Sequence, residues 1–99
     1  MGLFTAGIFS KVKGVKMYLH IGGEINLRKR EIVGIFDLDT ASTSPLTKYY
    51  LKEAEKKKRL HSVNEELPKS FVVTQGEDGE QSVWFSQISA SVLRKRCGE

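Results

Sequence analysis

The sequence has little cysteine and no long apolar run. Its single cysteine, Cys97, stands in a charged C-terminal stretch, which excludes an intrachain disulfide and a cysteine-based zinc site. Without a disulfide framework, a reducing and cytoplasmic setting is expected. No apolar stretch approaches the roughly 20 residues that span a bilayer, so no membrane-spanning segment is predicted.

Sequence motifs typical of enzyme active sites are also missing. The two histidines, His20 and His61, form neither an HxxxH nor an HExxH spacing, and no phosphate-binding glycine pattern occurs. Asp37 and Asp39 follow a strand with the spacing of some Mg²⁺ sites, although such pairs more often solvate a turn. No set combines a nucleophile, a base and an orienting group. We therefore expect a non-enzyme with no metal, cofactor or small-molecule substrate.

The charge of this 99-residue chain is uneven. The net charge is +4, but residues 1–16 contain three lysines and no acid, whereas residues 17–99 carry 13 basic and 12 acidic side chains. Because residues 17–99 are close to neutral, only local clusters of basic residues can favour an anionic partner. Such residues gather in three runs, at 28–30, 56–59 and 94–96. Such runs produce a local positive field. The simpler alternative, that each is only a solvated face, stays open.

Residues 1–16 differ from the rest of the chain. Their apolar residues precede their lysines, which is the reverse of a secretory signal, and Ala6 replaces the Ser or Thr of a myristoylation pattern. We expect an appendage or alternative-start extension over 1–16 and, since about 100 residues suit one core, a single domain over 17–99. A basic arm that touches a membrane or DNA is the alternative.

The first half of the domain is predicted to contain three strands. A β-rich segment at 17–21 is followed by the turn pair Gly22-Gly23 and a return strand at 24–27. Residues 31–37 indicate a buried strand, in which Gly34 marks a bulge or a close backbone approach. A polar loop follows at 40–44.

Ser44 and Pro45 predict the start of the main helix, because Ser caps orphan N–H groups and Pro suits the first helical position. We expect this helix over 45–59. Its inward stripe would comprise Leu46, Tyr49, Tyr50 and Ala54, with Leu51 on the flank. Its outer row, spaced by about four residues, would comprise Lys48, Lys52, Lys56 and Arg59.

The second half begins with a polar connection at 61–68. A hairpin over 70–86 turns at 76–79, and Ser89 caps a short helix at 90–96. The order of elements predicts an α+β fold. It consists of a small, mostly antiparallel sheet of about five strands, one main helix and a short C-terminal helix.

The basic runs are the candidate functional surface. The runs lack the interleaved aromatic residues on which the bases of a single-stranded nucleic acid stack. Contact with the backbone of double-stranded DNA is therefore favoured. A homo-oligomer would multiply these contacts, with exposed strand edges and Trp84-Phe85 as candidate contacts between copies. Two other functions stay open: an adaptor module that does not contact DNA, and a membrane-surface protein that uses residues 1–16.

Four segments together resemble the RemA/RemB family of small bacterial extracellular matrix regulators, and the RemB branch most closely. They are MYLHIGG at 17–23, REIVGIFD at 30–37, Ser44-Pro45, and PKSFVVT at 68–74. The resemblance extends over about residues 17–96, and it rests on the order of these segments and on the chain length. It implies a cytoplasmic, DNA-binding transcription regulator of matrix and biofilm genes, acting as an oligomer that is ring-shaped in the RemA branch.

The family's arginine after the second strand corresponds by position to Arg30, and its loop proline to Pro45. Its basic cluster before the last hairpin falls at 67–69, where only Lys69 is basic and two glutamates stand close by. Compensation for the missing arginines has to come from Arg28, Lys29 and the run at 56–59. The residues predicted to bind nucleic acid are Arg28, Lys29, Arg30, Lys56, Lys57, Arg59 and Lys69.

Overall fold

A computed structural model describes residues 17–41 and 44–98, and the predicted appendage at 1–16 lies outside them. The first half contains β1 (Tyr18–Gly22), β2 (Ile25–Arg28), the 3₁₀ turn η1 (Lys29–Glu31), β3 (Ile32–Asp37) and α2 (Leu38–Ala41). The second half contains α3 (Pro45–Lys56), β4 (Leu60–Ser62), β5 (Ser70–Gln75), β6 (Gln81–Ser86) and α4 (Ala90–Cys97).

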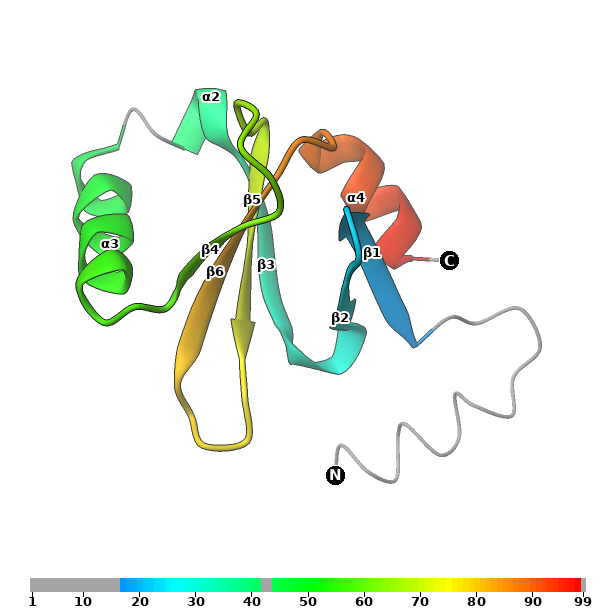
Figure 1. Ribbon diagram of the computed structural model, residues 1–99, viewed down its shortest axis with the longest axis horizontal. Helices are drawn as coiled ribbons and strands as arrows, with labels where there is room; N and C mark the ends of the chain where they lie inside the picture. The colour runs from blue at the N-terminus through cyan, green and yellow to red at the C-terminus, as the bar shows by residue number, and fades with distance from the viewer. Residues whose placement is uncertain (1–16, 42–43, 99) are drawn as a thin grey trace.

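The strands form two sheets (Figure 1). β1 and β2 make an antiparallel hairpin, and the other strands form a four-stranded sheet in the order β3-β5-β6-β4. Only β4 runs parallel to its neighbour, β6. The predicted α+β fold with a mostly antiparallel sheet is confirmed. The sequence predicts no strand in the polar connection at 61–68, but its first two residues belong to β4, with His61 opposite Trp84 and Ser62 opposite Phe85 of β6.

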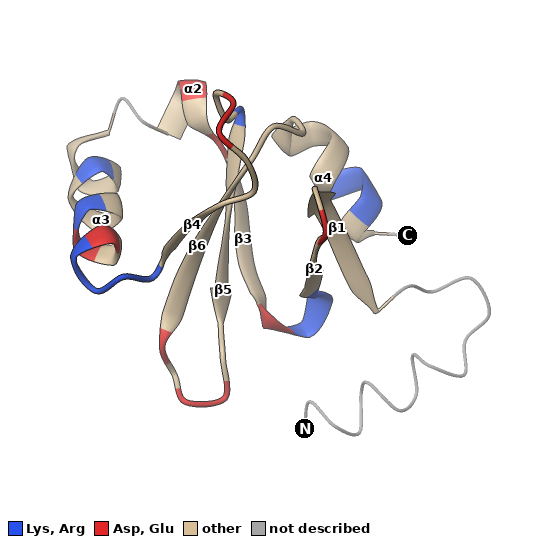
Figure 2. Ribbon diagram, in the orientation of Figure 1, with Lys and Arg blue, Asp and Glu red and all other residues tan. Residues whose placement is uncertain are grey.

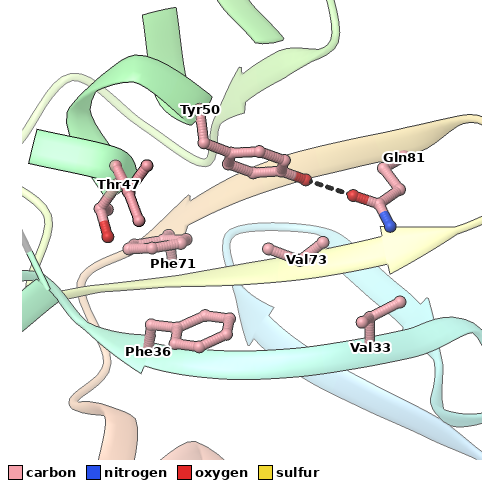
Figure 3. Close-up of a pocket in the computed structure, with 8 residues that line it drawn as sticks. Val33, Phe36, Thr47, Tyr50, Phe71, Val73 and Gln81 are labelled. Atoms are coloured by element: carbon pink, nitrogen blue, oxygen red, sulfur yellow. Dashed lines mark hydrogen bonds between the residues drawn. The ribbon is translucent and has the colours of Figure 1, made fainter. Parts of the chain in front are cut away.

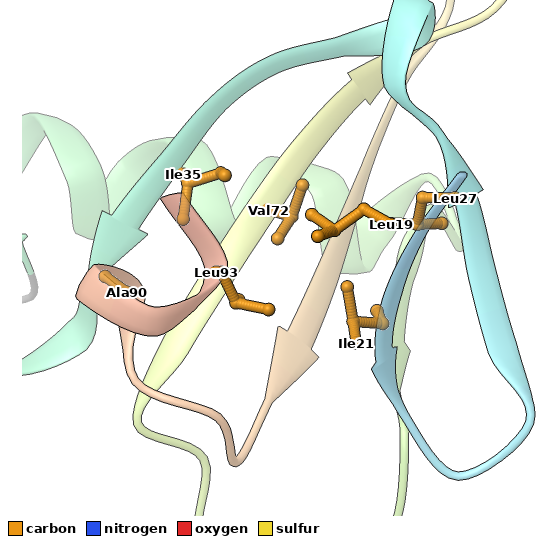
Figure 4. Close-up of a cluster of buried hydrophobic side chains, with 7 residues drawn as sticks. All are labelled: Leu19, Ile21, Leu27, Ile35, Val72, Ala90 and Leu93. Atoms are coloured by element: carbon orange, nitrogen blue, oxygen red, sulfur yellow. The ribbon is translucent and has the colours of Figure 1, made fainter. Parts of the chain in front are cut away.

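The sheet is covered on both faces. Side chains alternate along β5, so Val72 points toward the hairpin and α4, while Phe71 and Val73 point toward α3. Figure 4 shows the first of the two resulting cores. Its buried members are Leu19, Ile21, Leu27, Ile35, Val72, Ala90 and Leu93. The second core comprises Ala54, Phe71, Val73 and Val83.

Glycines at two places have the predicted roles. Gly22 and Gly23 adopt φ values of 118° and 53° in the β1–β2 turn, a conformation that favours glycine. At Gly34 the register with β5 shifts, and a Cβ added there would lie 2.6 Å from Cζ of Phe36. Both a bulge and a close approach are therefore present, and Phe36 can lie across its own strand.

The main helix begins where predicted, with Ser44 Oγ accepting a bond from the Thr47 N–H at 3.5 Å. Ala54 is buried against the sheet, with Tyr50 and Leu51 packed beside it. The prediction that Leu46 and Tyr49 also face inward was wrong, since they are 80% and 65% exposed. The helix packs on β6 and β4, and a single helix about 10 Å wide cannot also cover β3.

A buried hydroxyl joins the layers. Ser86 Oγ donates to the Ile21 carbonyl at 2.7 Å and accepts from the Ile88 N–H at 3.0 Å. Ser70 Oγ donates to the Ile88 carbonyl at 2.7 Å. These bonds attach the β1–β2 hairpin and the segment before α4 to the ends of β5 and β6.

We expect Ser86→Ala to lower the free energy of unfolding by about 2 kcal/mol, because two buried backbone groups lose a partner. Urea denaturation of the full chain measures this. Ser62→Ala is the matched control, since Ser62 is an exposed serine on β4, and it should change stability by less than about 0.5 kcal/mol. Equal losses in the two variants would contradict the role of Ser86.

Candidate nucleic-acid interface and apolar groove

The first basic run connects β2 to β3. Arg28 is the last residue of β2, and Lys29 and Arg30 belong to η1. The Lys29 N–H donates to the Met17 carbonyl at 2.9 Å, which fixes the turn against the start of β1. Arg30 Nη2 lies 3.9 Å from Glu77 Oε1 on the β5–β6 turn. The run is therefore held at the beginning of β3.

The second basic run forms the end of α3. Lys58 adopts a φ of 60°, its N–H donates to the Glu55 carbonyl, and the Arg59 N–H donates to the Ala54 carbonyl at 2.8 Å. These two bonds are those of a Schellman motif, in which glycine usually takes the left-handed position. The prediction that the helix continues to residue 59 was therefore wrong, because the chain reverses here into β4.

This reversal separates Arg59 from the lysine row. Arg59 Nε donates to the Gln81 carbonyl at 3.2 Å, so its side chain lies against β6 instead of continuing the row on α3. Lys56 Nζ lies 3.5 Å from Glu53 Oε2, and both side chains are solvated, so this pair contributes little to stability. Lys57 is exposed at the helix C-cap.

The two runs lie at the same end of the sheet, on opposite edges. β3, β6 and β4 run in the same direction, and both basic runs immediately precede an edge strand. Three strand spacings separate β3 from β4, which is about 14 Å. The acidic β5–β6 turn, with Glu77, Asp78 and Glu80, projects from the middle strands between them (Figure 2).

Lys69 lies at the other end of β3. Its carbonyl accepts from the Leu38 N–H at 3.0 Å, immediately beyond the end of that strand. Six residues of strand separate it from Arg30, which is about 20 Å. A single copy of the chain therefore does not combine Lys69 with the other predicted residues in one site.

The third basic run, at 94–96, was recognised in the sequence but not included in the predicted site. In the structure Arg94 Nη2 donates to the Ile35 carbonyl at 2.8 Å, and Arg96 Nη1 lies 3.4 Å from the His20 carbonyl. Two of its three side chains thus reach backbone acceptors on β3 and β1. The run of like charges was visible in the sequence, but these long-range bonds were not.

An apolar groove of about 300 Å³ lies between α3 and β3 (Figure 3). The rings of Phe36 and Phe71 stack in it with centroids 5.1 Å apart. The Tyr50 hydroxyl donates to Gln81 Oε1 at 2.6 Å, and burial raises the pKa of this tyrosine. The lining is completed by Val33, Leu46, Thr47 and Val73. No sequence pattern indicated this groove, because the amphipathic pattern assigned Leu46 to the core.

Neither a metal-binding cluster nor a membrane-spanning helix occurs among the described residues. Within 17–41 and 44–98, no group of three or more His, Cys, Asp or Glu side chains could hold a metal ion. No helix in these ranges is long and apolar enough to cross a membrane. Asp37 Oδ1 accepts from the Asp39 N–H at 2.8 Å, so this carboxylate caps the turn into α2.

The fold and the surface of the described residues define the class of protein: a small α+β domain with exposed basic runs and an open apolar groove between α3 and β3. No protein-family model matches the chain. It is 42% identical over 80 residues to Extracellular matrix regulatory protein B of Bacillus subtilis (strain 168), covering 81% of this chain and 89% of the relative. The chain therefore belongs to the RemA/RemB family, and the expected resemblance is confirmed.

We expect Lys58→Gly to raise the free energy of unfolding by about 1 kcal/mol, because glycine adopts the left-handed conformation without a Cβ penalty. Lys57→Gly removes the same charge one residue earlier, where φ is −84°, and should destabilise the chain. Thermal and urea unfolding of both variants measure the difference. The same sign of change in both would rule out backbone strain at Lys58.

Proposed function

We propose that this chain is a non-enzymatic regulator of extracellular matrix genes that binds the backbone of double-stranded DNA as a homo-oligomer. The regulatory part is supported by the relative, whose name describes it as an extracellular matrix regulatory protein. The DNA-binding part is supported by one arrangement above all. The runs at 28–30 and 56–59 lie at the same end of the sheet, on opposite edges.

The placement of the runs suits contact with one duplex. The turns that carry them emerge at the same end of the sheet, at its two edges, so basic side chains of both runs can approach the backbone of the same duplex. Lysine and arginine contacts to phosphate are independent of sequence and release counterions. One copy offers few such contacts, so several copies on one duplex would raise the affinity through effective concentration.

Charge removal from the runs tests DNA binding. We expect alanine at Arg28, Lys29 and Arg30, or at Lys56 and Lys57, to weaken duplex binding. Each lost phosphate contact should reduce the slope of log affinity against log salt by about 0.9. The assay is a titration of the full chain at about 50 and 200 mM salt. Lys48→Ala with Lys52→Ala is the matched control on the outer face of α3. Unchanged affinity in both run variants would refute the proposed site.

The acidic turn gives a second test with the opposite sign. Glu77 lies beside Arg30, and the turn projects between the two runs, so its carboxylates repel an approaching phosphate backbone. We expect Glu77→Gln with Asp78→Asn to strengthen duplex binding at low salt, with a smaller gain at high salt because of screening. Weaker or unchanged binding would show that DNA does not approach this end of the sheet.

The adaptor function without DNA contact is the second candidate. It is favoured by the near-neutral charge of residues 17–99 and by the open apolar groove. An assembled protein that binds no duplex at either salt concentration would support the adaptor function over DNA binding.

A further inference from the structure

The β1–β2 hairpin has an outer face that the core does not use. Its inner side chains, Leu19, Ile21 and Leu27, point into the first core (Figure 4). Because side chains alternate along a strand, the residues between them point away from that core. These residues are all exposed: Tyr18, His20, Asn26 and Arg28. We call these four side chains the ribbon face.

The ribbon face is compact. The register pairs its members across the two strands, as Tyr18 with Arg28 and His20 with Asn26. The bond from the Lys29 N–H to the Met17 carbonyl identifies a hydrogen-bonded pair. By alternation, both pairs of the ribbon face are of the other kind, in which side chains approach most closely, with Cβ atoms about 4.5–5.5 Å apart. The four side chains therefore form one block on the hairpin.

The chemistry of this block suits the edges of base pairs. Arg28 offers a fork of donors, which matches O6 and N7 of guanine, and Asn26 offers an amide, which matches N6 and N7 of adenine. His20 Nε2 donates to the Gly23 carbonyl at 2.9 Å, so the ring is held in place and its Nδ1 is left as an acceptor. Tyr18 is 53% exposed and presents an aromatic ring that can contact a thymine methyl group.

Basic side chains lie beside the ribbon face on two sides. By the same alternation, the His20 carbonyl points away from β2, and Arg96 Nη1 lies 3.4 Å from it, so the end of α4 lies along the β1 edge. Lys95, next to it, is exposed. The run at 28–30 follows the end of β2 (Figure 2), and Glu24, in the β1–β2 turn, lies at the opposite end from that run. These cations can face phosphates while the ribbon face meets the bases.

Contact with phosphates alone does not account for the composition of this face. A purely electrostatic surface requires only cations, and Arg28 is the one fixed cation among the four side chains. An amide, an imidazole and an aromatic ring contribute little to attraction for phosphate, but they differ in the base edges that they fit.

We propose that the ribbon face enters the major groove of the duplex and reads base edges, with Arg28 on guanine and Asn26 on adenine. The major groove admits a two-stranded ribbon and presents a distinct pattern for each base pair, whereas the minor groove is narrow and degenerate. This inference rests on the proposed function and deepens it, because it adds a sequence preference to the backbone contacts. Arg28 and Asn26 are two residues apart, about 7 Å, so the guanine and adenine should be about two base pairs apart.

The first test is selection by the full chain from a pool of duplexes with a randomised segment, at about 200 mM salt, where phosphate contacts contribute less. We expect the wild type to prefer the selected duplex over a shuffled one of equal composition by about tenfold or more. Asn26→Ala should reduce this ratio by about fivefold or more and relax the adenine position. Asn64→Ala, an exposed asparagine between β4 and β5, is the matched control and should leave the ratio unchanged.

The second test keeps the charge and changes the geometry. Lysine in place of arginine retains the cation but loses the planar fork of donors. We expect Arg28→Lys to leave the salt slope unchanged and to weaken the guanine preference by about fivefold or more. Arg30→Lys is the matched control, because Arg30 belongs to η1 and lies outside the ribbon face. Unchanged thermal unfolding confirms that every variant folds.

The groove is tested on the selected duplex itself. We expect methylation of the preferred guanine at N7, an atom of the major groove, to weaken binding by the same factor as Arg28→Lys. Unchanged binding to the methylated duplex would overturn contact through the major groove. A sequence preference that Asn26→Ala and Arg28→Lys leave intact would overturn the ribbon face as the reader.

The same titrations separate the inference from the proposed function. Salt-dependent binding with equal affinity for the selected and shuffled duplexes would refute base reading and leave the proposed function standing. A chain that binds no duplex at about 50 or 200 mM salt would refute the proposed function, and the ribbon-face inference with it.

Discussion

The burial of β5 on both faces is the constraint on which the rest of this fold depends. Phe71 and Val73 point to one face and Val72 to the other, and all three are buried. A strand of this kind must be covered on both faces. Removing one of its large apolar side chains from water stabilises the fold by about 1.5–3 kcal/mol. The chain supplies one cover with the β1–β2 hairpin and α4, and the other with α3. The two covers differ in width, and this difference produces the open groove.

The groove follows from the unequal reach of one helix and four strands. A helix about 10 Å wide covers about two strands spaced roughly 4.8 Å apart. α3 packs on β6 and β4, so the outer part of β3 keeps Val33 and Phe36 in solvent. Gly34 contributes to the same surface, because its missing Cβ lets the Phe36 ring lie across the strand. The groove is thus a consequence of how the second core is closed.

The basic runs occur where the chain changes direction. One lies in the 3₁₀ turn before β3, and the other in the Schellman turn before β4. Because β3 and β4 run in the same direction at the two edges of the sheet, both turns emerge at one end. The acidic turn of the β5–β6 hairpin emerges at that end as well. The charge pattern of this surface is therefore set by strand direction, and Lys69 is excluded from it for the same reason.

Local patterns in the sequence determined five of the six strands in the described residues, the Gly22-Gly23 turn, the Ser44 and Ser89 caps and the bulge at Gly34, since each depends on neighbouring residues alone. The segments shared with the family were equally readable. Only the tertiary structure decided that α3 ends at Lys56, that residues 60–62 join the sheet, and that Leu46 and Tyr49 remain exposed. Amphipathic periodicity shows that a helix has an apolar face, but how much of that face is covered depends on the width and position of the sheet beneath it.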